Sequence, residues 1–413
     1  MKIESFVYYF SLCVIIFSCS GKSHSNKNSL QRVDAAFSKE MTLKLSDFTE
    51  SIELIPLQTD EECLIGTVGK IKFRNDMYYV GSASMQTDKI LVFGEDGEFL
   101  YKLDKRGQGP DEYLEIQDFD VMENSNVLII TQSDHRLCIY NIEQDVCLVN
   151  IRLDVYPTNL LIEGEHVFLS NRGIKPIMSN GENETSEYAL YEFDLQGNLI
   201  DSYYKLNDVM RKKMAHFLPV RSFDANNNKI YFHYPFCDTI YEIKNKDLLP
   251  VFYLDFGTKK LSEDMFQKNI RDILDIVADI KRNQGVFTTK TFGITTNFIH
   301  FAFQDFENNG YVAFYDIKND QTVIGHHLVD DILFLGNKYT LESWKLPKSM
   351  DGEDLIWHIE ANHLKDAYES YKKRASKDEW SKFCSKHKGI FDICENLDEE
   401  DNPVLARIKI NLK

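Results

Sequence analysis

An apolar run that ends in an aromatic residue and is followed by a polar turn occurs five times along this chain. The five segments are Phe93–Gly97, Tyr140–Glu143, Phe193–Gly197, Tyr241–Asn245 and Tyr315–Asn319. Their aromatic residues are separated by 47, 53, 48 and 74 residues. A period of about 40 to 50 residues with strand-type patterning is typical of β-propeller blades. We therefore expect an all-β fold built from repeated blades.

Each repeat divides into four short runs separated by turn residues, as a four-stranded propeller blade requires. Residues 70–103 show this most clearly, because Asp96-Gly97 gives a strong hairpin signal before the last run. The same pattern predicts further blades at 117–153, 158–206, 221–256 and 290–329.

The sixth blade offers only three strands of its own, at 331–341, 355–359 and 404–412. The N-terminal segment 51–57 has the apolar alternation of a strand and can supply the fourth. Joining both ends of the chain in one blade removes two open sheet edges. We therefore predict a six-bladed β-propeller whose last blade is closed by an N-terminal strand.

Two segments with helical periodicity interrupt the blades. In 262–284, Ser262 is a candidate N-cap and apolar residues recur at helical spacing from Met265 to Ile280. The second segment, 363–388, carries many charges and precedes the third strand of the last blade. We expect both to be insertions. The first is expected to pack on the propeller, with a partner-docking surface as the alternative.

The first 18 residues have the pattern of an export signal. Their apolar stretch from Phe6 to Phe17 is shorter than the roughly 20 residues of a transmembrane helix. The order Ile16-Phe17-Ser18-Cys19 resembles the lipobox of bacterial lipoproteins, which implies lipidation of Cys19. An ordinary secretory signal is the alternative. We expect 19–33 to be a flexible tether and 34–413 to be the propeller.

The chain is strongly acidic, with 47 Lys and Arg against 65 Asp and Glu and a formal net charge of −18. Nucleic-acid binding needs clustered cations that displace counterions from phosphates, so this balance argues against a nucleic-acid partner. It argues equally against adhesion to anionic lipid headgroups. The acidic residues are spread along the chain, and we interpret them as favouring solubility.

Six cysteines remain outside the signal segment and the lipobox. An even number in an exported protein permits disulfides. Cys138 with Cys147, and Cys384 with Cys394, are near enough in sequence for local bridges, but the sequence does not decide whether either forms. The spacings lack the short Cys-x-x-Cys pairs of zinc sites, so no metal site is expected.

Residues 107–113, Gly-Gln-Gly-Pro-Asp-Glu-Tyr, lie between the first and second predicted blades. This run resembles the signature of the six-bladed β-propeller lipoproteins of Gram-negative gut commensals, a group similar to NHL and TolB propellers. The segments 51–59 and 402–405 resemble the two ends of the same family. The resemblance implies an exported, usually lipid-anchored propeller, and it carries over no catalytic residues.

Some members of that family occur beside glycan-utilisation systems, which implies a role near polysaccharide capture. Some also carry an acidic motif after the lipidated cysteine that marks surface export. Ser20-Gly21-Lys22-Ser23 lacks this motif. We therefore expect an outer-membrane anchor with the protein facing the periplasm rather than the cell surface.

The signature run does not fit a phosphate-binding loop, because a strand and not a helix N-terminus follows it. We expect Gly107, Gly109 and Pro110 to shape the crossing between blades and Glu112 and Tyr113 to anchor it, with ligand contact as the alternative.

Among the three tryptophans, Trp344 beside Lys345 and Pro347 is the best candidate for ligand contact from a loop. Metal-dependent propeller enzymes place His or carboxylate groups at equivalent positions of several blades. The predicted first-strand regions offer Asp118 and Asp120, Asn159, Asp224, Thr291 and Asp331, with no shared residue type in register. No Gly-x-Ser-x-Gly elbow occurs either. We therefore expect a module that binds a glycan, peptide or protein, without catalytic residues or a cofactor. The alternatives are a metal-dependent lyase or hydrolase of the NHL type and a non-catalytic envelope scaffold.

Overall fold

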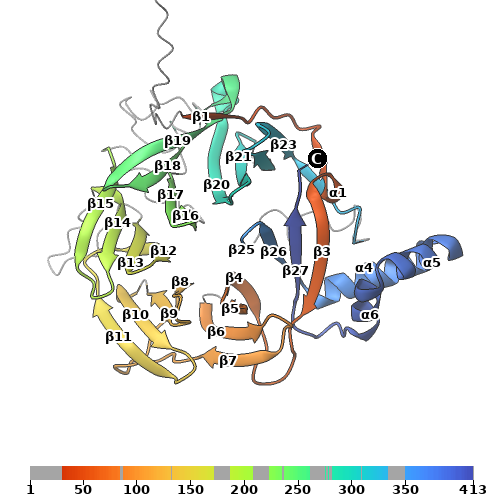
Figure 1. Cartoon of the computed structure of the whole chain (residues 1–413), viewed down its shortest axis with the longest axis horizontal. Helices are drawn as coiled ribbons and strands as arrows, with labels where there is room; N and C mark the ends of the chain where they lie inside the picture. The colour runs from red at the N-terminus through yellow and green to blue at the C-terminus, as the bar shows by residue number, and fades with distance from the viewer. Residues whose placement is uncertain are drawn as a thin grey trace, which may run out of the picture.

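Six blades, each with four antiparallel strands, form a ring in the computed structural model of the chain (Figure 1). In blade four a fifth strand joins the outer edge of the sheet. The structure describes residues 30–83, 87–131, 133–171, 187–207, 223–234, 237–260, 275, 278, 281–307, 309–333 and 349–412. The expected all-β, six-bladed propeller is therefore confirmed.

The first strand of each blade lies nearest the centre of the ring and the last strand lies at its rim (Figure 1). Blade one contains β4 (Thr67–Arg74), β5 (Met77–Ala83), β6 (Thr87–Gly94) and β7 (Phe99–Leu103). Blade two contains β8 (Asp118–Val121), β9 (Val127–Ile130), β10 (Arg136–Asn141) and β11 (Val146–Arg152). Blade three contains β12 (Pro157–Glu163), β13 (His166–Asn171), β14 (Tyr188–Asp194) and β15 (Leu199–Lys205).

Blade four contains β16 (Phe223–Asn226), β17 (Lys229–His233), β18 (Thr239–Lys244) and β19 (Asp247–Asp255). Blade five contains β20 (Val286–Ile294), β21 (Phe298–Asp305), β22 (Gly310–Asp316) and β23 (Gln321–Gly325). Blade six contains β25 (Ser349–Asp351), β26 (Asp354–Ile359), β27 (Val404–Ile410) and the N-terminal strand β3 (Thr49–Pro56).

Blade six closes the ring as the sequence predicts. Strand β3 pairs antiparallel with β27, in a register that runs from Thr49 opposite Ile410 to Pro56 opposite Val404. The expected inner strand at 331–341 is wrong where the structure describes it, because 331–333 form no strand. The inner strand is instead β25, only three residues long and without an apolar run, which explains why the pattern did not reveal it.

The N-terminal segment continues along the rim of neighbouring blades before it reaches β3. Strand β1 (Gln31–Asp34) pairs parallel with β19, and β2 (Thr42–Lys44) pairs parallel with β24 (His327–Val329). The short helix α1 (Leu45–Phe48) follows. Val33 is fully buried within this arrangement. The expected tether, 19–33, therefore overlaps the first strand of the fold by three residues.

Apolar side chains fill the spaces between adjacent blades, where alternate strand residues pack against the next sheet. The cluster between blades one and two is one example, formed from 13 buried residues that include Tyr79, Tyr113, Phe119 and Tyr140. All six cysteines outside the N-terminal segment are free, so neither of the two considered disulfides is present.

The insertion expected at 363–388 is a group of three helices, α4 (Ala361–Arg374), α5 (Lys377–Lys386) and α6 (Lys388–Asn396). They extend outward from the ring beside blade six (Figure 1). The chain turns at Ser376, whose side chain caps α5 by accepting a hydrogen bond from the backbone of Glu379. Most of 262–284 lies outside the described residues. In the described part, no helix is long and apolar enough to cross a membrane.

Candidate functional site

The two faces of the propeller differ in the length of their connections. One face, which we call the tight-turn face, carries the links from first to second strands and, in blades one to five, from third to fourth strands, each two to five residues long. The opposite face carries the links from second to third strands and the crossings between blades. On this face, six pairs of successive strand ends are separated by long stretches of sequence, namely 104–117, 172–187, 206–222, 256–285, 330–348 and 360–403. We call it the long-connection face.

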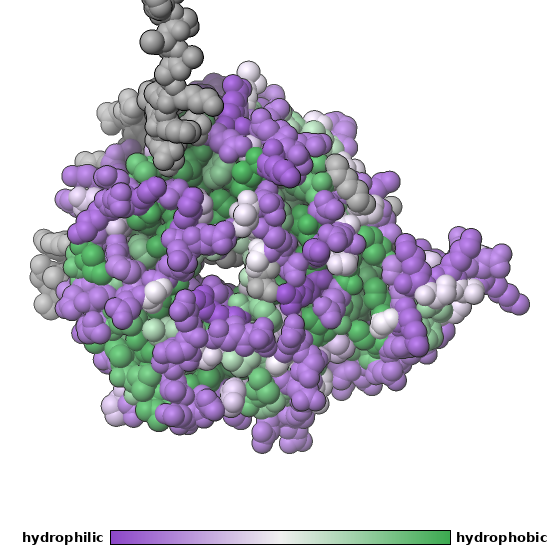
Figure 2. Space-filling model, in the orientation of Figure 1, coloured by the Kyte–Doolittle hydropathy of each residue, from purple (hydrophilic) through white to green (hydrophobic). Residues whose placement is uncertain are grey.

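An opening lies at the centre of the ring, bordered mainly by hydrophilic residues (Figure 2). We call it the channel. The inner strands β4, β8 and β12 contribute basic, acidic and neutral polar side chains to this part of the molecule. Inner strands have an unpaired edge, and their backbone N–H and C=O groups need other partners. The polar side chains of blades one to three supply them.

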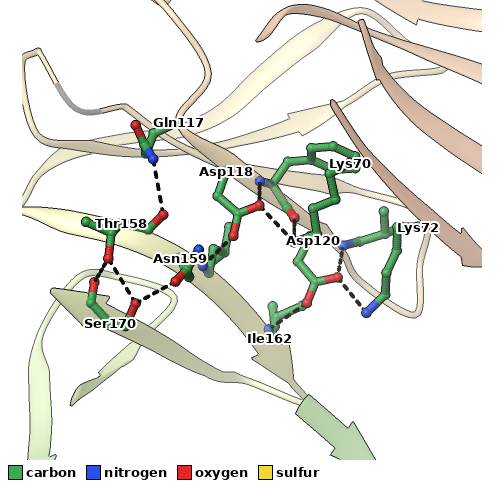
Figure 3. Close-up of polar contacts among 12 residues, drawn as sticks. Lys70, Lys72, Gln117, Asp118, Asp120, Thr158, Asn159, Ile162 and Ser170 are labelled. Carbon is green, nitrogen blue, oxygen red and sulfur yellow. Dashed lines mark hydrogen bonds and ion pairs between the residues drawn. The ribbon is translucent and has the colours of Figure 1, made fainter. Parts of the chain in front are cut away.

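Two aspartates of β8 join three blades in the same way (Figure 3). Asp118 accepts from Lys70 Nζ of blade one at 2.8 Å and from the backbone N–H of Leu160 in blade three at 2.8 Å. Asp120, two residues further along, pairs with Lys72 Nζ at 2.9 Å and accepts from the backbone N–H of Ile162 at 3.0 Å. Each carboxylate thus uses one oxygen for a lysine and the other for the next blade.

An aspartate also accepts a hydrogen bond from the backbone of the next blade between blades four and five. In blade four, Asp224 accepts a hydrogen bond from the backbone N–H of Ile294 in blade five at 2.9 Å. Asp118, Asp120 and Asp224 were all considered from the sequence as axial groups. In the structure, each of the three carboxylates accepts a hydrogen bond from a backbone N–H of the following blade. This contact joins adjacent blades of the ring.

The pairing keeps the buried carboxylate of Asp120 charged. Burial acts to raise its pKa, because the side chain is 1% exposed. The positive charges of Lys72 and Lys70 and the hydrogen bonds outweigh this effect, so the pKa of Asp120 is lowered. The lysines and aspartates beside the channel therefore pair with one another. Because these contacts occupy the oxygens of both carboxylates, the two aspartates are not free to bind a metal.

Neutral polar groups lie beside this ion-paired region (Figure 3). Ser170 Oγ lies 3.0 Å from Thr158 Oγ1 and donates to Asn159 Oδ1 at 3.1 Å. Gln117 Nε2 donates to the backbone oxygen of Thr158 at 3.3 Å. Gln117 and Asn159 are partly exposed. They lie near the starts of β8 and β12, where the chain arrives from the long-connection face.

The signature residues form a compact crossing between blades one and two. Tyr113 is buried, its hydroxyl donates to the backbone oxygen of Leu103, and its ring meets that of Tyr140 edge to face. Glu112 Oε2 accepts from the backbone N–H of Gly109 at 2.7 Å. A Cβ on Gly107 would lie 1.9 Å from the same Glu112 oxygen, so only glycine fits beside this carboxylate as it stands.

Pro110 takes part through its backbone, whose oxygen accepts from Asn150 Nδ2 of β11 at 2.7 Å. These contacts lie within the crossing and between it and its neighbouring strands. The structural role of the signature and the alternative of ligand contact both stay predictions. Cys19 and Trp344 lie outside the described residues. In the described part of the chain, no group of three or more His, Cys, Asp or Glu side chains could hold a metal ion.

The sequence did not reveal the pairing of Lys70 and Lys72 with the two aspartates. Its only signal was the alternation Lys70-x-Lys72 and Asp118-x-Asp120 on predicted inner strands. Alternate residues of a strand lie on the same face. Two lysines at alternate positions of one inner strand and two aspartates at alternate positions of the next are therefore a recognisable signal for two ion pairs.

Residues 30–409 match the family described as "Domain of unknown function (DUF4934)", which is nearly the whole chain. The chain belongs to the DUF4934 family. No curated protein matches this DUF4934 chain.

Among solved structures, this DUF4934 protein is similar to a "putative exported protein" from Bacteroides fragilis. The two share 17% identity with a TM-score of 0.64, over 90% of this chain and 99% of the other. At that identity the likeness shows a shared fold.

Two further structures match more weakly. Virginiamycin B lyase from Staphylococcus aureus has 9% identity and a TM-score of 0.36, over 74% of this chain and 81% of its own. BamB from Moraxella catarrhalis has 13% identity and a TM-score of 0.35, over 67% and 66%.

Proposed function

We propose that this protein is an exported, lipid-anchored module of the cell envelope that binds a ligand or partner on its long-connection face. Similarity to the "putative exported protein" from Bacteroides fragilis supports export. The lipobox at Cys19 and the following segment without an acidic motif support a lipid anchor that faces the periplasm.

The difference between the two faces is the observation that carries this proposal. Every first-to-second link, and every third-to-fourth link in blades one to five, is five residues or fewer. On the opposite face, six pairs of successive strand ends are separated by 14 residues of sequence or more. Loops that exceed what a fold needs are where binding residues concentrate on a rigid scaffold. The interlocked inner strands supply that scaffold.

The chemistry at the channel favours an uncharged polar ligand. The Lys and Asp side chains are paired with each other. Gln117 and Asn159, which hydrogen-bond to Thr158 and Ser170 respectively, are neutral and partly exposed near the long-connection face. Amides and hydroxyls hydrogen-bond the hydroxyls of a glycan or the backbone of a peptide. We therefore include glycans and cell-wall peptides as the first ligand classes to test.

A thermal-shift screen of the chain from Ser20 onward tests the proposal, since this removes no described residue. Glycans, muropeptides and divalent metals would be screened, with a chelator control. A ligand that binds the native state raises the unfolding temperature in a concentration-dependent way. The double variant Gln117→Ala, Asn159→Ala should lose the shift.

The double variant Gln144→Ala, Gln196→Ala is the matched control, because both glutamines are exposed in tight turns of the opposite face. It should keep the shift. An equal shift in both variants would contradict binding near the channel. A shift caused by a metal and abolished by the chelator would favour the metal-dependent enzyme instead.

A further inference from the structure

The positive charge of this acidic protein is concentrated at the end of its helical appendage. Residues 372–388 contain seven Lys and Arg residues and only two carboxylates. The seven are Lys372, Lys373, Arg374, Lys377, Lys382, Lys386 and Lys388, and all are exposed. We call this group the basic tip. The whole-chain charge of −18 conceals it.

Most of the cations in the basic tip are not neutralised by neighbours. Lys372 pairs with Glu395 at 2.6 Å. In the described part of the chain, none of the other six has a carboxylate within salt-bridge distance. Of the two carboxylates, Glu379 caps α5 by accepting from the backbone N–H of Ser376 at 2.8 Å. The tip therefore presents an excess of positive charge to its surroundings.

The helices hold the basic tip in a fixed shape. Trp380 of α5 packs against Tyr368, Tyr371, Phe383 and Phe391, with ring centroids 5.6 to 6.2 Å apart. The first half of α4 belongs to the core of blade six, where Leu364 is fully buried. The cations are thus displayed on a small folded unit rather than on a loose loop.

The appendage also separates the cations from the acidic body. It extends outward from the ring and its outer end is largely hydrophilic (Figures 1 and 2). Charges further apart than about 8 Å are largely screened at physiological salt. The tip can therefore meet an anionic surface while the repulsion of the body is screened.

We infer that the basic tip docks on a membrane surface with anionic phospholipid headgroups, as a contact additional to any lipid anchor. The cations are exposed and are distributed over parts of three helices, so a broad charged plane can contact more of them than a small bound anion can. Each Lys or Arg near such a surface contributes about 1 kcal/mol to attraction. This inference does not depend on lipidation of Cys19.

Vesicle co-sedimentation of the chain from Ser20 onward tests the inference. The probes are phosphatidylcholine vesicles with and without phosphatidylglycerol. The wild-type chain should bind only the anionic vesicles, and added salt should weaken binding. The combined charge reversals Lys373→Glu, Lys377→Glu, Lys382→Glu and Lys386→Glu should weaken binding by roughly a hundred-fold or more.

A matched variant separates position from total charge. Lys102→Glu, Lys244→Glu, Lys246→Glu and Lys318→Glu change the net charge equally, and all four lysines are exposed on the body of the propeller. This variant should retain most of the binding. Four Lys→Gln substitutions at the tip should give an intermediate loss without new carboxylates near the helix ends.

Three results would overturn the inference. The first is that the wild-type chain does not bind anionic vesicles. The second is that the two charge-reversed variants lose vesicle binding equally. The third is that the chain binds soluble dextran sulfate but no vesicles. The last result would assign the tip to a soluble polyanion.

Discussion

The carboxylate of Asp120 accepts a hydrogen bond from the backbone N–H of Ile162, across the boundary between two blades. Its other oxygen pairs with Lys72 of a third blade. A single buried side chain therefore connects three sheets and covers an open strand edge. The ring of this DUF4934 protein is held together at its centre by polar contacts as well as by apolar packing between blades.

Substitution Asp120→Asn should destabilise the protein by roughly 2–3 kcal/mol. The amide can still accept from Ile162, but Lys72 loses its buried counter-charge. Urea unfolding monitored by fluorescence would measure the change. Asp366→Asn is the control, because Asp366 is exposed on α4, and it should change stability by less than about 0.5 kcal/mol. Equal effects would argue against the role given to Asp120.

Acid should remove the contribution of Asp120. Its pKa is lowered in the folded state, so its stabilising effect is fully present above the unfolded value of about 3.9 and is lost as pH falls through the native pKa. The difference in unfolding free energy between wild type and Asp120→Asn should therefore shrink below about pH 4. A difference that stays constant there would contradict the lowered pKa.

A second pH effect is expected from His233, which is buried in β17 and donates from Nε2 to the backbone oxygen of Cys237 at 2.7 Å. Burial lowers the pKa of His233 to about 4. Below the unfolded value of about 6.5 the unfolded chain takes up the proton first. Stability should fall by about 1.4 kcal/mol per pH unit between these two values.

The variant His233→Gln isolates this effect, because glutamine can keep a donor for Cys237 without titrating. Relative to this variant, wild type should lose stability as pH falls from 6.5 toward 4. Parallel pH profiles of the two proteins in thermal unfolding would rule out a depressed pKa.

The closure between blades six and one depends on Arg407. Its Nε donates to Asp354 at 2.8 Å, and its guanidinium lies 5.0 Å from the ring centre of Phe73 in blade one. Arg407→Met should cost about 1–3 kcal/mol, measured by urea unfolding. Lys409→Met, which removes only an exposed pair with Glu50, should cost less than about 1 kcal/mol. A larger loss of stability in Lys409→Met than in Arg407→Met would contradict the role given to Arg407 in closing the ring.

The signature crossing gives a double-mutant test. Gly107→Ala would place a methyl group against Glu112 and displace its carboxylate from Gly109. The expected cost is about 1–2 kcal/mol, the loss of that hydrogen bond. In a Glu112→Ala background the same substitution should cost markedly less. Additive effects would show that the two residues do not constrain each other.

The blades were predictable because their strands carry local signals. Apolar alternation and turns such as Asp96-Gly97 identify the sheets, and the alternation of 51–57 was sufficient to predict ring closure. The strands β25 and β1 were not predicted. Strand β25 is only three residues long and has no apolar run, although it pairs with the adjacent β26. Strand β1 depends on long-range pairing with β19, which the sequence does not reveal.

The candidate site was harder to foresee. The residues Asp118, Asp120 and Asp224 share no residue type in register with the other blades. Their contacts with the next blade are made to backbone N–H groups, which leave no trace in a sequence. The cluster of Lys and Arg that forms the basic tip is evident in the sequence at 372–388. It was not recognised because only the total charge of −18 was considered.

The central claim, that the long-connection face binds a partner, is best tested by site-specific photo-crosslinking in cells that export the protein. Photoreactive residues would replace Ser133 and Glu187 on that face, and Glu143 and Gln196 on the tight-turn face, all four of which are exposed. The account predicts crosslinked products from Ser133 or Glu187 and none from the other two. Products from Glu143 and Gln196 alone, or equally from both faces, would contradict it.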